Sequence, residues 1–433
     1  MARIGAIARD KGLKDVFYLM LTQVATLLVP LMTFPWAVRA LHPPAYGRYS
    51  FGVAVVQYLL IIVDFGFQFA ASRRVVELQT QGKDISAYYW TVQVAKFGLF
   101  VATTASIGIF WLLSPDIRQA MGVILASLPL LLASILQSTW LFLGVGAMAA
   151  SSIAVLVARL AFVIPVFLLV RAPGDEWILA LLNSGGALLG GLICTGIVLR
   201  RKLVTRFVLP SFRAVRAAYG DGFHLFIAQG AVSLYAASNA IVLGFVSTDT
   251  QVAYFAAADR LRGLSSMPIV AVTNAYFGRI AKGLRTDPPG TGPLLRNVTW
   301  LLVFGMGFVS IVTFVAADLI VYIVLGARFG AAAAVLRVLS PIPFIVGLNS
   351  VFGNLVMLNL GLKRQFSAML VACGALNVVL LAVLGHQLGA VGAAAALLFT
   401  EALVTAAFWY QLHKRGISVF RGRLDGVEPV AAN

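Results

Sequence analysis

The chain has 433 residues, of which 60% are hydrophobic and only 11% are charged. Its apolar runs of about 18 residues or more exclude a soluble globular domain, because such runs are typical of membrane-spanning helices. A net charge of +17 would suggest a nucleic-acid partner for a soluble protein. In a membrane protein, basic loops that face an anionic leaflet account for the same excess. We therefore expect membrane lipids, and no nucleic acid, as partners.

Twelve membrane spans are predicted, because a hydrocarbon core of roughly 30 Å needs about 20 apolar residues per helix. The first six are expected at 15–38, 45–70, 87–113, 120–143, 149–170 and 177–199. The second six are expected at 219–246, 251–278, 298–325, 331–359, 365–386 and 389–412. Of the 33 basic side chains, 23 lie in alternate connections and tails and four in the intervening connections. By the positive-inside rule, this asymmetry and the even number of spans place both termini in the cytoplasm.

The basic stretch 200–218 separates two sets of six spans. Residues 46–52, which open the second span, have a counterpart in residues 252–258, which open the eighth. Because six is even, the two halves have the same topology and are related by an axis along the membrane normal. The predicted parts are an N-lobe (1–205), a C-lobe (206–416) and a cytoplasmic tail (417–433).

Prolines interrupt several of these spans, namely Pro30, Pro35, Pro268, Pro341 and Pro343. Proline kinks a helix and frees a carbonyl group, which a membrane tolerates only where neighbouring groups or cavity water satisfy it. The kinks are either features of packing or bends that let each lobe open and close.

Six basic side chains lie inside predicted spans: Arg48, Lys96, Arg159, Arg260, Arg262 and Arg337. Arg48 is close to the outer interface and is interpreted as an interfacial anchor. The other five lie deeper, where a cation persists only in a bundle interior or a wet cavity. Guanidinium groups pair bidentately with oxyanions, so we expect these five to line a central cavity for a phosphate or carboxylate ligand. The alternative is internal ion pairing, such as Arg262 with Asp259 three residues earlier.

Three buried carboxyl groups are candidates for ion coupling: Asp64, Glu401 and Asp259. A carboxyl group in a membrane can carry a proton when alternate conformations expose it to the two sides. Asp64 shares a helix face with Gln57 and Gln68, so this face is polar and is expected to contact water. The alternative for Glu401 is a permanent counter-ion to Arg159 or Arg337.

No pattern typical of catalysis or metal binding occurs. There is no glycine-rich phosphate loop, the four histidines lack metal-ligand spacing, and Cys194 and Cys373 both lie in predicted spans. Every outer connection is shorter than about ten residues. The connection between the fifth and sixth spans contains the acidic pair Asp175-Glu176, which is interpreted as a solvated turn. We therefore expect a transporter that is not an enzyme and has no cofactor or metal.

Four segments near the N-terminus carry a more specific pattern: 28–41 (LVPLMTFPWAVRAL), 46–50 (YGRYS), 63–67 (VDFGF) and 72–74 (SRR). In combination they resemble the start of the Wzx-type O-antigen flippases, which belong to the polysaccharide-transporter family of the MOP superfamily. The resemblance is strongest over about residues 25–80, and as topology it extends over the whole chain.

This resemblance implies a MATE-like all-α fold of twelve helices in two six-helix lobes. It also implies flipping of undecaprenyl-pyrophosphate-linked oligosaccharide repeat units across the bacterial inner membrane by alternating access, with proton antiport. A polysaccharide polymerase and a chain-length regulator would be partners. The five deep cations, Lys96, Arg159, Arg260, Arg262 and Arg337, would then hold the pyrophosphate or acidic sugars.

Other functions stay open. A lipid II flippase is also cationic inside but commonly carries two more helices. A multidrug exporter of the same fold is expected to hold an acidic cavity, whereas this interior is basic. A small-anion transporter would need no lipid carrier, and a membrane glycosyltransferase or polymerase would need a larger periplasmic loop than any found here.

Overall fold

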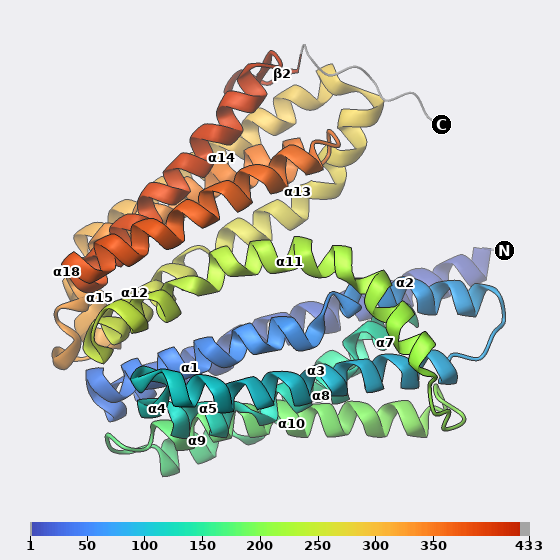
Figure 1. Cartoon of the computed structure of the whole chain (residues 1–433). Coiled ribbons are helices and arrows are strands. Elements are labelled where there is room, and N and C mark those ends of the chain that lie inside the picture. Colours follow the sequence, from blue (N-terminus) through green and yellow to red (C-terminus); the bar gives the residue numbers. More distant parts are fainter. Residues whose placement is uncertain (1, 425–433) are drawn as a thin grey trace. The chain divides into compact units, whose positions relative to one another are not determined.

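The structure is a computed structural model that describes residues 2–424, with side chains described for 32–223, 226 and 238–424. In this part of the chain every element is helical except one short two-stranded hairpin (Figure 1). Contacts divide the chain into two compact units, Met1–Ser233 and Leu234–Asn433, and the division falls inside one long helix, α11.

The helices of the first unit are α1 (Ala2–Asp64), α2 (Phe67–Thr80), α3 (Ser86–Leu113), α4 (Pro115–Gln119), α5 (Met121–Ser127), α6 (Pro129–Gln137), α7 (Thr139–Gly144), α8 (Met148–Ala161), α9 (Val163–Leu169), α10 (Glu176–Arg200) and the first part of α11 (Phe212–Val246). The most extensive helix packing in this unit is that of α10 against α5, α6 and α8, and that of α2 against α7. The core beside α2 and α3 is apolar and includes Phe67, Trp140 and Phe142.

The second unit continues from α11 through α12 (Asp249–Ser265), α13 (Met267–Thr286), α14 (Pro288–Val315), α15 (Ala317–Val324), the short 3₁₀ helix η1 (Ala327–Phe329), α16 (Ala332–Leu339), α17 (Ile342–Asn349), the π-helix η2 (Ser350–Met357), α18 (Lys363–His413), β1 (Ile417–Ser418), the 3₁₀ turn η3 (Val419–Arg421) and β2 (Arg423–Leu424). Its core joins α13, α14, η2 and α18 and includes Leu302, Phe352 and Phe408.

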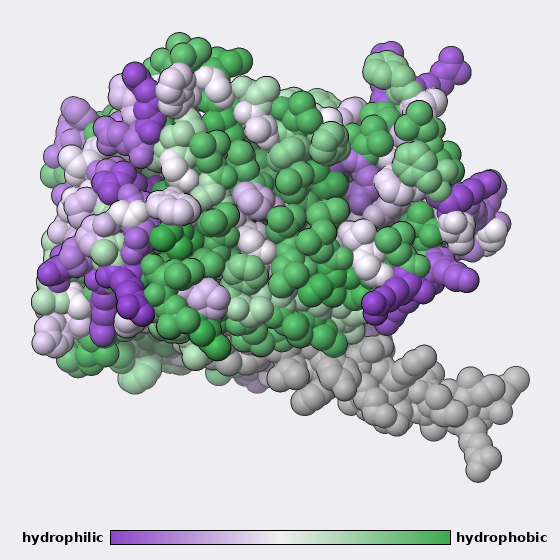
Figure 2. All heavy atoms as spheres, turned by 90° about the horizontal axis from the view of Figure 1, so that it is seen from below, coloured by the Kyte–Doolittle hydropathy of each residue, from purple (hydrophilic) through white to green (hydrophobic). Residues whose placement is uncertain are grey.

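Among the described residues, eight helical segments are long and apolar enough to cross a membrane. Two of them, Met32–Thr80 and Lys363–His413, have 49 and 51 residues, about twice what one crossing needs. The backbone leaves the helical conformation inside both, at His42 (φ 62) and at Gly389 (φ 60). On the face shown in Figure 2, hydrophobic side chains gather in a broad band between hydrophilic side chains at the two ends. The protein is therefore a multi-pass membrane protein.

The two units contain the same order of elements. A helix break at His42 in the first unit corresponds to the break between α11 and α12 in the second. The next helix is interrupted in both, between α1 and α2 and between α12 and α13. A helix of 28 residues follows in each (α3 and α14), then a short helix (α4 and α15), then a broken segment (α5–α7 and α16–η2). The weak sequence repeat thus accompanies a clear repeat of structure.

One predicted span is misplaced. The expected spans 251–278 and 298–325 leave the stretch 279–297 between them. In the structure α13 runs to Thr286 and α14 begins at Pro288, so the helix expected from residue 298 starts ten residues earlier. The turn-rich residues at this point form a helix cap. Proline occupies the first turn of α14, and the Asp287 carboxylate accepts a hydrogen bond from the backbone N–H of Gly290 at 3.0 Å. Both features favour a helix start.

The prolines mark only some of the observed breaks. Pro268 lies in the first turn of α13, and Pro341 directly precedes α17. Both positions are expected, because proline disfavours the interior of a continuous helix. Pro35, by contrast, lies within α1, and the backbone there is non-helical only at His42. Pro30 falls outside the residues whose side chains are described.

The predicted cytoplasmic tail begins as a folded hairpin. Ile417 and Ser418 pair with Leu424 and Arg423 in an antiparallel ladder, and the turn between them packs on α14. The Phe420 ring lies 5.8 Å from Trp300 and 6.0 Å from Phe352. These ring contacts, and buried aliphatic side chains on both strands, make residues 417–424 part of the core of the second unit. Residues 425–433 lie outside the described part of the chain.

Two glycines make this docking possible. Gly422 adopts left-handed backbone (φ 65), and Gly292 lies in the first turns of α14 directly against it. A Cβ atom on Gly292 would overlap the carbonyl oxygen of Gly422. The two backbones therefore approach closer than any side chain allows.

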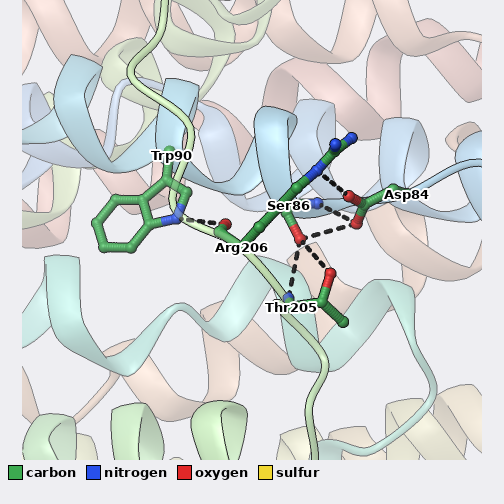
Figure 3. A network of polar contacts seen from close by, with 5 residues as sticks. All are labelled: Asp84, Ser86, Trp90, Thr205 and Arg206. Atoms are coloured by element: carbon green, nitrogen blue, oxygen red, sulfur yellow. Dashed lines mark hydrogen bonds and ion pairs between the residues drawn. The ribbon is translucent and has the colours of Figure 1, made fainter.

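In the first unit, a polar network joins the connection after α10 to the start of α3 (Figure 3). The Asp84 carboxylate accepts hydrogen bonds from the backbone N–H and hydroxyl of Ser86, at 2.9 and 2.7 Å, and pairs with Arg206 at 2.8 Å. The Ser86 hydroxyl also accepts the backbone N–H of Thr205, and the Trp90 indole donates to the carbonyl of Arg206. These bonds fix the connection between α10 and α11 to the start of α3.

Replacing Gly292 by Ala should displace the hairpin, because the added methyl group overlaps the Gly422 backbone. We expect a loss of about 1–3 kcal/mol in the free energy of unfolding, the usual range for overpacking, seen as a lower midpoint of thermal unfolding in detergent. Gly278 on α13 is the matched control, since a Cβ there meets nothing within 4 Å and Gly278→Ala should stabilise the helix. Equal midpoints for the two variants would contradict the docking.

The hydrogen bonds from Ser86, with a smaller contribution from Arg206, hold the pKa of Asp84 below its ordinary value. A carboxyl group whose folded-state pKa is depressed stabilises the fold above its unfolded pKa of about 3.9, and this contribution disappears as the pH falls through the folded-state value. Asp84→Asn should therefore unfold at a lower temperature than the parent at pH 7. The difference should vanish in acid, and a constant difference from pH 7 down to about pH 3 would contradict this assignment.

Candidate functional site

Asp64 occupies the last position of α1, directly before a helix break. Phe65 (φ 41) and Gly66 (φ 72) both adopt left-handed backbone, and α2 begins at Phe67. Glycine is favoured at such a position because a Cβ atom makes left-handed backbone costly. The carboxylate of Asp64 lies at the negative end of a helix dipole, where an anion is disfavoured unless a cation accompanies it.

Lys96 on α3 supplies this cation. Its Nζ atom lies 2.8 Å from Oδ1 of Asp64 and donates a second hydrogen bond, at 2.9 Å, to the carbonyl oxygen of Ser134. That carbonyl is available because α6 ends at Gln137 and Ser138 turns left-handed (φ 44) instead of continuing the helix. Only 4% of the Lys96 side chain is exposed, against 46% for Asp64. The ion pair thus has one buried end and one end open to a cavity.

This cavity has a volume of about 260 Å³ and lies wholly within the first unit. Its lining residues come from seven helices and are Gln57, Leu60, Asp64, Gln68, Lys96, Leu130, Ser134, Gln137, Thr139, Trp140, Arg159 and Ala187. The predicted polar face of Gln57, Asp64 and Gln68 is present along it. The volume suits a small charged group with several waters, each of which takes about 30 Å³.

Arg159 on α8 is the unpaired charge of this cavity. It is half-buried, and no hydrogen bond or ion pair joins it to any residue of the described chain. Since Asp64 pairs with Lys96, the lining carries one cation in excess. A guanidinium group in these surroundings provides several N–H donors in a planar fork, which is the geometry that carboxylate and phosphate oxygens accept.

Trp140 is a lining residue that the sequence did not single out for this role. Its side chain is buried, and its indole N–H has no hydrogen-bond partner among the described residues. After the break at Ser138, α7 packs against α2 and α8, and the Trp140 ring contacts those of Tyr88 and Tyr89. A buried donor without a partner is costly, so an acceptor at this position would be stabilising.

In the second unit the predicted cations are distributed differently. Arg262 pairs with Asp259 at 2.7 Å, which is the internal ion pair that the sequence left as the alternative. Arg337 pairs with Asp318 on α15, and both side chains are exposed to solvent by more than a third. Arg260 is exposed on α12. Joint lining of one central cavity by all five cations stays a prediction.

Glu401 on α18 lies beside another interrupted helix. It accepts a hydrogen bond from the Asn349 amide at 2.9 Å, and the Asn349 carbonyl accepts the Thr405 hydroxyl at 2.6 Å. Asn349 is the last residue of α17, immediately before the π-helix η2. Within each unit, therefore, one membrane carboxyl group is hydrogen-bonded to a side chain at or near a break in the helices.

Arg48 does more than anchor the chain at the interface. Its guanidinium donates two hydrogen bonds to Oε1 of Glu176, at 2.9 and 2.7 Å, and both side chains are largely buried. Glu176 also accepts the backbone N–H of Gly174. The expectation that Asp175 and Glu176 form a solvated turn is wrong for Glu176, because the ion pair with Arg48 draws it inside.

The fold resembles those of two solved membrane-protein structures. It matches the lipid II flippase MurJ in its inward closed conformation with a TM-score of 0.73 and 14% identity, over 91% of this chain and 87% of that one. An inward-facing multidrug resistance MATE transporter of the MOP superfamily matches with a TM-score of 0.63 and 14% identity, over 89% of this chain and 94% of that one. At this identity the likeness shows the fold alone.

Sequence relatives give the family. Residues 13–284 match the family described as "Polysaccharide biosynthesis protein". A putative O-antigen transporter of Escherichia coli (strain K12) is 32% identical over 394 residues, 91% of this chain and 94% of the relative. One of Shigella dysenteriae is 24% identical, over 90% of this chain and 97% of the relative. The chain belongs to this polysaccharide biosynthesis family, and the resemblance to Wzx-type proteins is confirmed.

Lys96 and Arg159 should differ in what they contribute to stability. Lys96→Met leaves both the Asp64 carboxylate and the Ser134 carbonyl without their donor, so we expect a loss of about 1–3 kcal/mol. Arg159→Met removes no hydrogen bond or ion pair with a described residue and should change the free energy of unfolding by about 0.5 kcal/mol or less. The measurement is the thermal unfolding midpoint in detergent. A larger loss for Arg159→Met would indicate that Arg159 is a structural residue.

Proposed function

We propose that this protein is a flippase for lipid-linked oligosaccharide repeat units, of the O-antigen or exopolysaccharide kind. It moves them from the cytoplasmic to the periplasmic leaflet of the bacterial inner membrane by alternating access. The undecaprenyl tail stays in lipid between helices, and the pyrophosphate or acidic sugars pass through a cationic interior. Family membership and the O-antigen transporters among the relatives support this proposal.

The observation that carries the proposal is the unpaired Arg159 in a polar cavity of an apolar helix bundle. A cation in a membrane protein persists where it has water or an anionic partner. An oxyanion that enters this cavity meets Arg159 directly and Lys96 beside it, so binding neutralises the excess charge. A cationic drug would add to the same positive charge and be repelled by it, which favours an anionic substrate over a cationic one.

Topology is part of the same proposal. Twelve spans, six in each lobe, bring both termini and the most basic connections to the cytoplasmic side. The lobes are 1–205 and 206–416, followed by the tail 417–433. Polymerase and chain-length regulator would take over the repeat unit on the periplasmic side.

Transport is driven by an ion gradient through carboxyl groups within the helix bundles. Asp64, Glu401 and Asp259 are the candidates, and the first two adjoin helix breaks that can change shape between conformations. Asp64 is half exposed to the cavity and pairs with Lys96. A proton that replaces Lys96 as its partner would free a second cation for the substrate, which links the protonation state to anion binding.

Arg159→Glu should abolish transfer of a fluorescent undecaprenyl-pyrophosphate oligosaccharide between leaflets of reconstituted liposomes, because it reverses the charge that meets the substrate. We expect at least a roughly tenfold drop in the transfer rate, with partial activity in Arg159→Lys. Arg118→Glu is the matched control, since Arg118 is exposed on the short helix α4. Equal losses in both variants, or normal transfer in Arg159→Glu, would remove this cavity from the pathway. Transport of drugs or small anions instead would keep the fold and change the substrate.

Glu401→Gln should remove the acceleration of transfer by an imposed pH gradient, because an amide cannot carry a proton, while downhill transfer continues. The same liposomes report it, with and without a gradient. Since the substituted amide retains an oxygen that accepts from Asn349, the fold should be preserved. Full acceleration in Glu401→Gln would leave Glu401 as a structural partner of Asn349 and transfer the coupling role to Asp64, tested by Asp64→Asn.

A further inference from the structure

The connection between α10 and α11 is the most one-sided stretch of charge in the chain. Residues 200–216, which we name the basic linker, contain six basic side chains, and no acidic residue occurs from 177 to 220. Arg206 pairs with Asp84. The other five form no ion pair with a described residue and are exposed: Arg200, Arg201, Lys202, Arg213 and Arg216.

Three large apolar side chains of the same linker are also exposed. Phe207, Leu209 and Phe212 have 67%, 78% and 83% of their surface free. Phe207 and Leu209 lie on non-helical backbone, and Phe212 opens α11, so all three lie outside the eight membrane-length segments, whose exposed apolar side chains face lipid. Exposed apolar groups interleaved with cations are typical of a segment that lies in the interfacial layer of a membrane.

The linker is held at the depth of that layer from both sides. It leaves α10, whose 25 residues extend about 37 Å, enough to cross a core of roughly 30 Å and end among the headgroups. It is then tied to α3 near the start of that helix. The backbone N–H of Thr205 donates to the Ser86 hydroxyl (Figure 3). Val204 is buried in the core of the first unit, and the Phe207 ring lies 4.6 Å from Trp90.

We propose that the basic linker is a membrane-docking segment that binds anionic phospholipid. Leu209 and Phe212 insert among the headgroups where α3 and α10 end, and the five unpaired cations bind the lipid phosphates. Charge selects the lipid: five cations without acidic partners match an anionic surface and gain less from a zwitterionic one. The proposal requires only that α3 and α10 span the membrane, and it is independent of the substrate that is transported.

The test is a fluorescent label at Leu209→Cys in the full chain, reconstituted into phosphatidylcholine vesicles with or without one third phosphatidylglycerol. Both native cysteines are buried, so an environment-sensitive maleimide reacts with the introduced one. Gln81→Cys, exposed in the connection between α2 and α3, is the matched control. Quenching by brominated lipid should be at least twofold stronger at 209 than at 81 in the anionic vesicles. It should fall by half or more in phosphatidylcholine alone.

A second variant separates lipid binding from simple insertion. Replacing Arg201, Arg213 and Arg216 by Gln in the Leu209→Cys protein should reduce the quenching in anionic vesicles to the level in phosphatidylcholine. The three side chains are exposed, so the unfolding midpoint in detergent should not change. Quenching at 209 no stronger than at 81 would overturn the proposal and leave the linker free for a soluble partner. Strong quenching that depends on neither lipid charge nor the three arginines would overturn the recognition of anionic lipid.

Discussion

Backbone groups at helix breaks are the constraint on which this structure depends. A break inside hydrocarbon frees carbonyl and N–H groups that lipid cannot satisfy. At several breaks in this chain, a polar side chain from another helix forms a hydrogen bond with such a group. Lys96 reaches the Ser134 carbonyl at the break before α7, and Thr195 donates to the neighbouring Leu136 carbonyl at 3.0 Å. In the second unit Gln251 accepts the backbone N–H of Ala390, directly after the break at Gly389.

The functional chemistry follows from this constraint. A helix that is broken and satisfied by side chains carries polar groups into the membrane interior, and water or a ligand can accompany them. The first unit uses this at Asp64, Lys96 and Arg159, where two breaks lie next to one cavity. The second unit has the same order of elements, but its cations Arg262 and Arg337 are paired with acids on nearby residues. In the described chain, the first unit therefore has a cavity with an excess cation, and in the second unit two of the predicted cations are compensated.

Much of this could be predicted from residue types alone. Hydropathy identified the helices because a membrane imposes their length, and the burial of Lys96 followed from its depth in the span. The motif VDFGF contains the break after α1, at Phe65 and Gly66, and the Asp64 directly before this break lines the cavity. Other features could not be predicted. Asp287 and the prolines after it begin α14 ten residues before the expected span, and Trp140 is buried just after left-handed backbone at Ser138, for which the sequence has no distinctive signal.

By itself the sequence determined the class of protein, because hydrocarbon thickness and the cost of charge in lipid constrain each segment independently of its neighbours. It also determined the family, through four short motifs near the N-terminus. Only the tertiary structure decided which charges are paired and which face a cavity. Lys96 and Arg159 look alike in sequence, yet Lys96 pairs with Asp64 on another helix, whereas Arg159 faces the cavity and forms no ion pair with a described residue. Ion pairing depends on atoms brought within about 4 Å by helices far apart in the chain, and residue spacing along one helix cannot specify that distance.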